Sequence, residues 1–167
     1  MKKLIICLFL FSFSNLYSSE IKFEKIFDDL NKPWSLSFIN KENVIITEKT
    51  GRLLILNLKN KNINEIKHNL SLISLGQGGL LDVLYRDNTI YVSYSENRGN
   101  WETSTTVAKG IFNKEKIVFK NIFRAEPPID SGYHFGSRLV IRDKHLYVTA
   151  GERGQGMIAQ DATKHPG

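Results

Sequence analysis

Cysteine is almost absent from this chain. Its 167 residues include one cysteine, Cys7, which lies in an apolar run near the N-terminus. The rest of the chain therefore forms no internal disulfide and must be held together by a hydrophobic core. This excludes the class of small secreted domains whose loops are tied together by several disulfides.

Long hydrophobic runs are also scarce. The one candidate is Leu4 to Phe13, which follows two lysines and precedes Ser18 and Ser19. A membrane-spanning helix needs about 20 apolar residues and this run has about ten, so we expect no stable membrane anchor. A basic start, a short apolar core and small residues are typical of a secretory signal peptide. We therefore predict a cleaved signal over residues 1–19 and a periplasmic or secreted protein, with an uncleaved anchor as the alternative.

The chain has no dense cluster of charge of one sign. Lys and Arg number 23 against 17 Asp and Glu, which gives a formal net charge of +6. The lysines are spread through turns beside asparagines, as in residues 57–62. A nucleic-acid footprint would gather basic residues around aromatic platforms, so we expect no nucleic-acid partner.

Sustained helical periodicity is missing, and a repeated strand pattern takes its place. A short apolar run, a polar turn, a second apolar run and a glutamate occur in residues 36–48, 82–96 and 139–152. The three glutamates, Glu48, Glu96 and Glu152, are 48 and 56 residues apart. Short runs rich in β-branched and aromatic residues, split by Asn and Asp, predict β-hairpins.

Further strands are expected between these repeats, over residues 52–58, 105–112 and 117–123, the last two forming a pair. Four strands in each repeat of about 40 to 50 residues are typical of a β-propeller blade. A β-sandwich also explains short alternating strands, but it does not explain a pattern that recurs at this spacing. The predicted fold class is all-β, with residues 20–167 forming the N-terminal part of a single β-propeller domain.

The predicted ring is incomplete. Propellers close with about 4 to 8 blades, and this chain is long enough for about three. We expect it to be an N-terminal fragment of a larger ring. Alone, it would expose a sheet face and open strand edges, so we expect aggregation or poor folding.

One histidine stands out by its surroundings. His134 lies between Gly132 and Gly136, directly before the apolar run that starts at Leu139. Glycines let a large planar ligand approach the backbone, and an imidazole exchanges protons near neutral pH. His134 is therefore a candidate general base. The alternative is an inert, hydrogen-bonded histidine at the entry to a strand.

Five motifs in a fixed order carry a resemblance to a known family. They are Lys32-Pro33-Trp34-Ser35-Leu36, Thr47-Glu48-Lys49-Thr50-Gly51-Arg52, Gly76-Gln77-Gly78-Gly79-Leu80-Leu81-Asp82, His134-Phe135-Gly136-Ser137-Arg138-Leu139 and Gly151-Glu152-Arg153-Gly154-Gln155. From about Leu30 to its last residue, the chain resembles the PQQ-dependent aldose sugar dehydrogenases, the glucose/sorbosone dehydrogenase family.

This resemblance implies an enzyme. It implies a six-bladed propeller with pyrroloquinoline quinone (PQQ) over its central mouth, assisted by a calcium ion (Ca2+). It further implies oxidation of an aldose at C1 to the lactone, with His134 taking the proton of the anomeric hydroxyl as hydride passes to the quinone. A downstream electron acceptor would then reoxidise the cofactor.

The resemblance also assigns further site residues. Gln77 and Tyr133 would lie at the sugar, and Arg138 could reach the anionic cofactor. The alternatives are that Gln77 is only a turn residue and that Arg138 forms a structural ion pair. Most ligands of PQQ and calcium come from later blades in the family, so we assign no metal ligand here and expect the fragment alone to be inactive.

Two other functions remain open at this stage. A non-catalytic exported propeller that binds a sugar or a protein partner would keep the blade motifs and lose the base. A lactonase-like hydrolytic propeller would need converging carboxylates or histidines around a central metal, and the sequence shows no such cluster.

Overall fold

The structure, a computed structural model, describes residues 21–167. The predicted signal peptide and Cys7 lie outside the described residues. Within residues 21–167 the chain forms eleven β-strands and one short 3-10 helix, Gly156–Gln160, with no α-helix. No helix in this part of the chain has the length and apolar character needed to cross a membrane.

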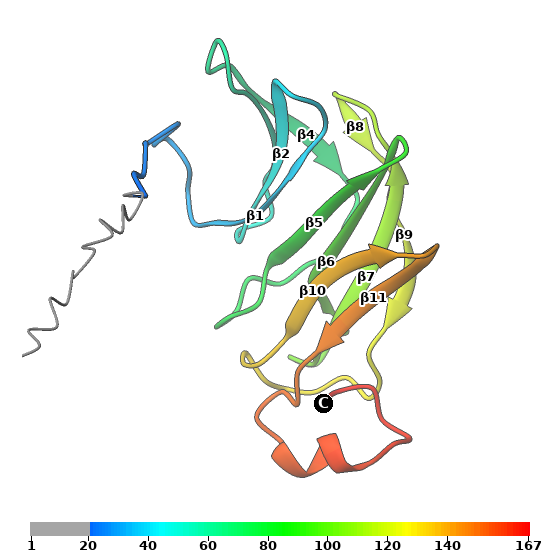
Figure 1. Cartoon of the computed structure of the whole chain (residues 1–167). Coiled ribbons are helices and arrows are strands. Elements are labelled where there is room, and N and C mark those ends of the chain that lie inside the picture. Colours follow the sequence, from blue (N-terminus) through cyan, green and yellow to red (C-terminus); the bar gives the residue numbers. More distant parts are fainter. Residues whose placement is uncertain (1–20) are drawn as a thin grey trace, which may run out of the picture.

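The strands form three sheets that follow one another along the chain (Figure 1). The first sheet consists of β1 (Pro33–Phe38), β2 (Asn43–Glu48), β3 (Leu53–Asn57) and β4 (Ile63–His68), with β8 (Lys116–Ile117) added beside β4. The second consists of β5 (Leu80–Arg86), β6 (Thr89–Asn97), β7 (Thr103–Ile111) and β9 (Lys120–Arg124). The third is the hairpin of β10 (Gly136–Arg142) and β11 (His145–Ala150).

The threefold sequence repeat corresponds to the first hairpin of each sheet. The pairs β1–β2, β5–β6 and β10–β11 are all antiparallel, and each has a register shift near the start of its first strand. These shifts lie at Pro33/Ser35, Leu80/Val83 and Gly136/Leu139. The predicted all-β, blade-like fold is confirmed, with the third sheet represented by two strands.

One predicted strand is wrong. Residues 117–123 do not form a single strand, because β8 pairs in parallel with β4 of the first sheet while β9 pairs with β7 of the second. The chain changes sheets at Phe119, whose backbone N–H donates to the side chain of Asn69 at 2.7 Å and whose carbonyl accepts from it at 3.1 Å. The Asn69 amide thus satisfies both backbone groups where the strand is interrupted.

The main core lies between the first and second sheets. Buried aliphatic side chains of β2, β3 and β4 meet those of β5, β6 and β7, and Tyr94 and Phe119 join them. A buried carboxylate then links all three sheets. Asp82 on β5 accepts hydrogen bonds from the Ser35 hydroxyl at 2.5 Å and from the Leu139 backbone N–H at 2.7 Å.

The outer face of the first sheet is only partly covered. Val44, Ile46, Leu54 and Leu56 form a second apolar cluster, against which residues of the 27–30 segment pack. A largely apolar groove remains open above this cluster, and it includes the exposed side chains of Leu36 and Phe38.

Candidate active site

His134 lies where the third sheet begins, and Glu152 lies where that sheet ends. The antiparallel register pairs Gly136 with Ala150, so the residues just before β10 and just after β11 are neighbours. His134 has a left-handed backbone with φ of 50°, and a Cβ placed on Gly151 would be 2.0 Å from its carbonyl oxygen. Glycine at 151 is therefore required for this close approach.

The imidazole of His134 is held by the carboxylate of Glu152. Its Nδ1 is hydrogen-bonded to Glu152 Oε1, which also accepts the Gly154 backbone N–H at 3.1 Å. The hydrogen bond from His134 lowers the pKa of Glu152 below its ordinary value, and hydrogen bonds from the backbone N–H groups of Glu152 and Gly154 lower it further. An ionised Glu152 keeps the proton on Nδ1, which leaves the lone pair of Nε2 able to accept a proton from a bound hydroxyl.

This pair is a variation on a carboxylate that each repeat contains. Glu48 and Glu96, at the equivalent positions, are buried and form ion pairs with Arg52 at 3.1 Å and Arg124 at 2.7 Å. In the third repeat the partner is a histidine, and both side chains are partly exposed. The carboxylate that pairs with an arginine in the first two sheets thus pairs with an accessible imidazole in the third.

Gln77 reaches the histidine loop from the second sheet. Its side-chain carbonyl accepts the His134 backbone N–H at 2.9 Å, and its own backbone N–H donates to Gly132 at 2.7 Å. The two loops are in direct contact, since a Cβ on Gly76 would be 2.4 Å from the Gly132 carbonyl oxygen. Gln77 therefore fixes the backbone of His134, and the structure brings together two residues that the sequence places 57 positions apart.

The other two predicted site residues lie differently. Tyr133 is exposed, with its ring centroid 6.3 Å from that of His134 in an edge-on arrangement. Arg138 donates through Nη1 to Asp82 at 3.0 Å and otherwise remains largely exposed. Tyr133 is thus part of the His134 loop, while Arg138 forms the ion pair weighed above as the alternative.

Sequence reasoning missed the role of Arg153, which entered only as one member of a motif. Its buried guanidinium donates to the carbonyls of Ser131 and Tyr133 and to both oxygens of Thr103, the Tyr133 bond measuring 2.8 Å. It also lies 3.7 Å from the centre of the Phe135 ring. Burial lowers the pKa of Arg153 to about 10. The Arg153 side chain thus links the residues on either side of His134 to β7. No local sequence pattern predicts such a set of partners.

Comparison with known proteins identifies the family to which the chain belongs. A model of the Glucose / Sorbosone dehydrogenase family matches residues 30–167. The chain belongs to this family. It is 31% identical over 157 residues to the aldose sugar dehydrogenase YliI of Escherichia coli, a match that covers 88% of this chain and 42% of that protein.

Solved structures of similar proteins share the fold. The apo-form of the soluble aldose sugar dehydrogenase from Escherichia coli is 32% identical, with a TM-score of 0.80 over 86% of this chain and 44% of that one. The PQQ-bound aldose sugar dehydrogenase from Streptomyces coelicolor is 20% identical, with a TM-score of 0.76 over 86% of this chain and 45% of that one. The chain spans less than half the length of these relatives.

The described part of this glucose/sorbosone dehydrogenase family member offers no metal cage. Among residues 21–167, no group of three or more His, Cys, Asp or Glu is arranged to hold a metal ion. Calcium prefers six to eight oxygen ligands. The described residues therefore supply no such carboxylate or histidine cluster for the calcium ion that the resemblance implies.

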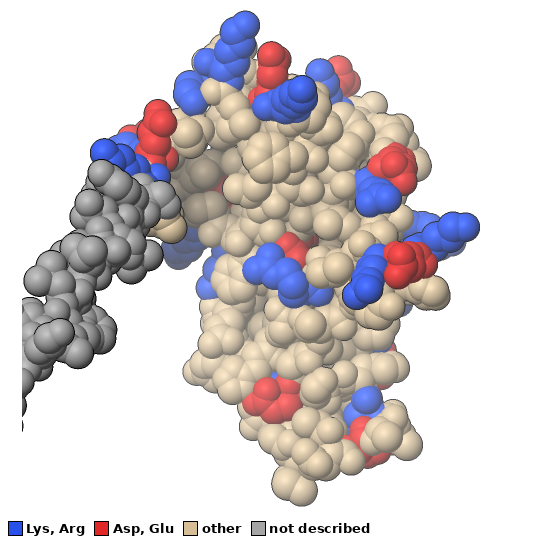
Figure 2. Space-filling view, viewed as in Figure 1, with Lys and Arg blue, Asp and Glu red and all other residues tan. Residues whose placement is uncertain are grey.

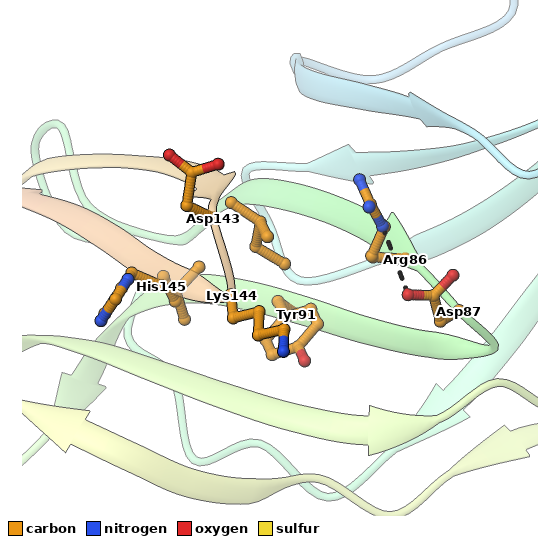
Figure 3. Close-up of a pocket in the computed structure, with 8 residues that line it drawn as sticks. Arg86, Asp87, Tyr91, Asp143, Lys144 and His145 are labelled. Atoms are coloured by element: carbon orange, nitrogen blue, oxygen red, sulfur yellow. Dashed lines mark hydrogen bonds and ion pairs between the residues drawn. The ribbon is translucent and has the colours of Figure 1, made fainter.

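A polar hollow lies at the opposite end of the same sheets (Figure 3). It is formed by the β5–β6 and β10–β11 turns, and its lining includes Arg86, Asp87, Tyr91, Lys144 and His145. Arg86 is paired with Asp87 at 3.3 Å, and both are well exposed. Because β10 and β11 run the whole way from this hollow to His134, it is separate from the candidate active site.

Proposed function

We propose that this chain is part of an exported quinoprotein oxidoreductase that oxidises an aldose sugar at C1 to the lactone. Membership of the glucose/sorbosone dehydrogenase family supports the reaction class. The observation that carries the proposal is the accessible His134–Glu152 pair at one end of the sheets.

PQQ is the proposed cofactor, as in the relative from Streptomyces coelicolor. When bound, the quinone supplies the acceptor for the hydride that leaves C1. Arg138 has donors beyond its single bond to Asp82 and is the residue of this chain proposed to contact the anionic cofactor. We assign no calcium ligand to residues 21–167, because no suitable cluster is present there.

The chain's own residues would handle the proton. His134 accepts the proton of the anomeric hydroxyl at Nε2, while Nδ1–H stays bonded to Glu152. The ionised carboxylate stabilises the imidazolium that forms. Gln77 holds the His134 backbone in place, and Tyr133 borders the sugar.

The test uses a full-length protein that contains this sequence. We expect dye-linked aldose oxidation that depends on added PQQ, and a loss of about 100-fold or more in kcat for His134→Ala. His145→Ala is the matched control, since His145 is an exposed histidine at the other end of β11 and should leave kcat unchanged. A His134→Ala protein that keeps most of its turnover would remove the proposed base. Sugar binding without PQQ-dependent oxidation would instead support the non-catalytic alternative.

The remaining parts of the proposal concern the cell and the isolated chain. The N-terminal pattern of residues 1–19 supports export, and a downstream electron acceptor is the expected partner. The 167-residue chain alone should show no turnover with PQQ and calcium, because it spans less than half of its relatives.

A further inference from the structure

The turn between β6 and β7 displays an exposed tryptophan in an unfavourable backbone conformation. Glu102 donates its backbone N–H to the Gly99 carbonyl at 2.8 Å, which closes a four-residue turn. The two central residues, Asn100 and Trp101, have φ of 50° and 67°, as in a type I′ turn. A bulky residue with positive φ is a genuine outlier, and glycine is the residue most favoured at the position of Trp101.

Within residues 21–167, two other turns have the same left-handed pair, and both place polar residues there. These are Asp87-Asn88 and Asp143-Lys144, which lie in the hairpins at the opposite end of the sheets. Trp101 instead presents an indole that is 72% exposed. The second sheet has the first and third sheets as neighbours within the described chain, so an unpartnered sheet face does not cause this exposure.

The turn is firmly held. The guanidinium of Arg98 donates to the Ser104 hydroxyl at 3.0 Å and forms an ion pair with Glu126 at 2.8 Å. Gly99 donates its backbone N–H to the Asn97 side chain at 3.0 Å. The indole is thus presented from an ordered loop, which reduces the entropy lost when a ligand binds.

Trp101 also lies at the same end of the sheets as His134. Thr103, two residues after it, donates its hydroxyl to the Ser131 carbonyl at 3.1 Å and its backbone N–H to Ile129 at 3.0 Å. Arg153 bonds both Thr103 and Tyr133, so the tryptophan turn and the histidine loop share one anchor. In Figure 1 the β6–β7 turn and the loop that leads into β10 both lie at the lower end of the sheets.

The chemistry around Trp101 suits a neutral sugar. Asn100 and Glu102 flank the indole in sequence and carry an amide and a carboxylate that can hydrogen-bond hydroxyl groups. In Figure 2 most Lys, Arg, Asp and Glu side chains lie over the upper and middle parts of the molecule, and fewer lie over the lower part. One aromatic ring matches the apolar face of one pyranose, whereas a stable protein interface buries about 800 Å² on each partner.

We propose that Trp101 forms a second carbohydrate subsite, which stacks on a sugar unit of an oligosaccharide whose reducing end lies at His134. This inference rests on the proposed function for the identity of the first site, while binding at Trp101 itself requires no turnover. The substrate class would then include short oligosaccharides, with Trp101 contributing to the binding of units beyond the first.

The experiment measures binding separately from activity. In a full-length protein containing this sequence and the His134→Ala substitution, titration calorimetry would compare glucose with maltotriose and cellotriose. We expect at least one trisaccharide to bind about tenfold more tightly than glucose, and Trp101→Ala to remove that advantage while leaving the affinity for glucose unchanged. Trp101→Phe should restore part of it.

Matched controls make the outcomes distinct. Tyr147→Ala removes another strongly exposed aromatic side chain, on β11, and should leave trisaccharide affinity unchanged. The inference is overturned if neither trisaccharide binds more tightly than glucose, or if Trp101→Ala weakens the binding of both ligands equally. It is also overturned if the Trp101 indole becomes buried only when a protein partner binds. Trisaccharide binding that needs Trp101, together with no PQQ-dependent aldose oxidation by the protein that retains His134, would contradict the proposed function and keep this subsite.

Discussion

At the residue scale, the site depends on which partner each buried or half-buried charge has. Glu48 and Glu96 meet arginines, and Glu152 meets an imidazole. Arg153 meets carbonyl and hydroxyl oxygens of Tyr133, Thr103 and Ser131 and the ring of Phe135. These partners leave the His134 imidazole accessible and hold the His134 backbone in place.

Substitution of Glu152 tests the positioning of the base. Glu152→Gln removes the negative charge that stabilises the imidazolium, so we expect kcat for aldose oxidation to fall at least about tenfold with little change in KM. Glu152→Asp should recover part of the loss. Steady-state kinetics of the full-length protein would measure this, and a Glu152→Gln protein with unchanged kcat would contradict the role.

Arg153→Met tests the buried cation. The substitution removes the hydrogen bonds that the guanidinium donates to Thr103, Ser131 and Tyr133 and leaves the Tyr133 carbonyl without this donor, so we expect the free energy of unfolding to fall by about 3 kcal/mol. Urea denaturation of the full-length protein gives the value. Arg142→Met is the control, because Arg142 is an exposed arginine of β10 and should change stability by less than about 0.5 kcal/mol.

At the scale of elements, each sheet begins with a bulged hairpin, and polar side chains join one hairpin to the next. Asp82 connects β5 to β1 and β10, and the Ser93 hydroxyl donates to the Ser137 carbonyl at 2.6 Å. Within the second sheet, Glu96 on β6 is bonded by Arg124 of β9 and by the Thr106 hydroxyl of β7. The second sheet is thus held by a carboxylate as well as by its backbone ladder.

This carboxylate predicts a pH dependence. Burial raises the pKa of Glu96, but the hydrogen bonds from Arg124 and Thr106 and the Arg124 charge outweigh it, so the pKa lies below its ordinary value. A lowered folded pKa gives stability that is present above the ordinary carboxyl pKa and is lost as the pH falls through the folded value.

Arg124→Met should therefore shift the loss of stability to higher pH. Without the guanidinium, burial dominates and the pKa of Glu96 rises. Urea unfolding of the full-length protein between pH 7 and pH 3 would measure the shift. If the two proteins lose stability over the same pH range, the ion pair does not control acid sensitivity.

At the scale of the whole molecule, the described chain is an open arc of sheets. The groove on the first sheet exposes Leu36 by 55% and Phe38 by 61%, and β11 has one strand partner, β10, among the described strands. Exposed apolar faces and unpaired strand edges favour association between chains.

The isolated 167-residue chain should therefore self-associate. We expect light scattering during size-exclusion chromatography to show species larger than a monomer that grow with concentration, and the double substitution Leu36→Lys and Phe38→Lys to reduce them. Val118→Lys is the control, because Val118 is an exposed valine between β8 and β9, away from the groove. A monomer with a sharp, cooperative melting transition at every concentration would refute this expectation.

The sequence by itself determined the all-β class, the first hairpin of each sheet and the family. Alternating apolar residues and Asn or Asp turns are signals that span only a few residues. The three hairpins could therefore be predicted from short stretches of the sequence. The motifs also singled out Gln77 and His134, although the 2.9 Å hydrogen bond between them is seen only in the structure.

Only the tertiary structure decided how distant side chains pair. The jump of residues 117–123 between sheets depends on Asn69, and the anchoring of the histidine loop depends on Arg153 reaching Thr103, 50 positions away. The exposure of Trp101 beside that loop likewise follows from how β7 packs against the 129–131 segment. Such pairings are set by the stacking of one sheet on the next, which no local pattern of residues specifies.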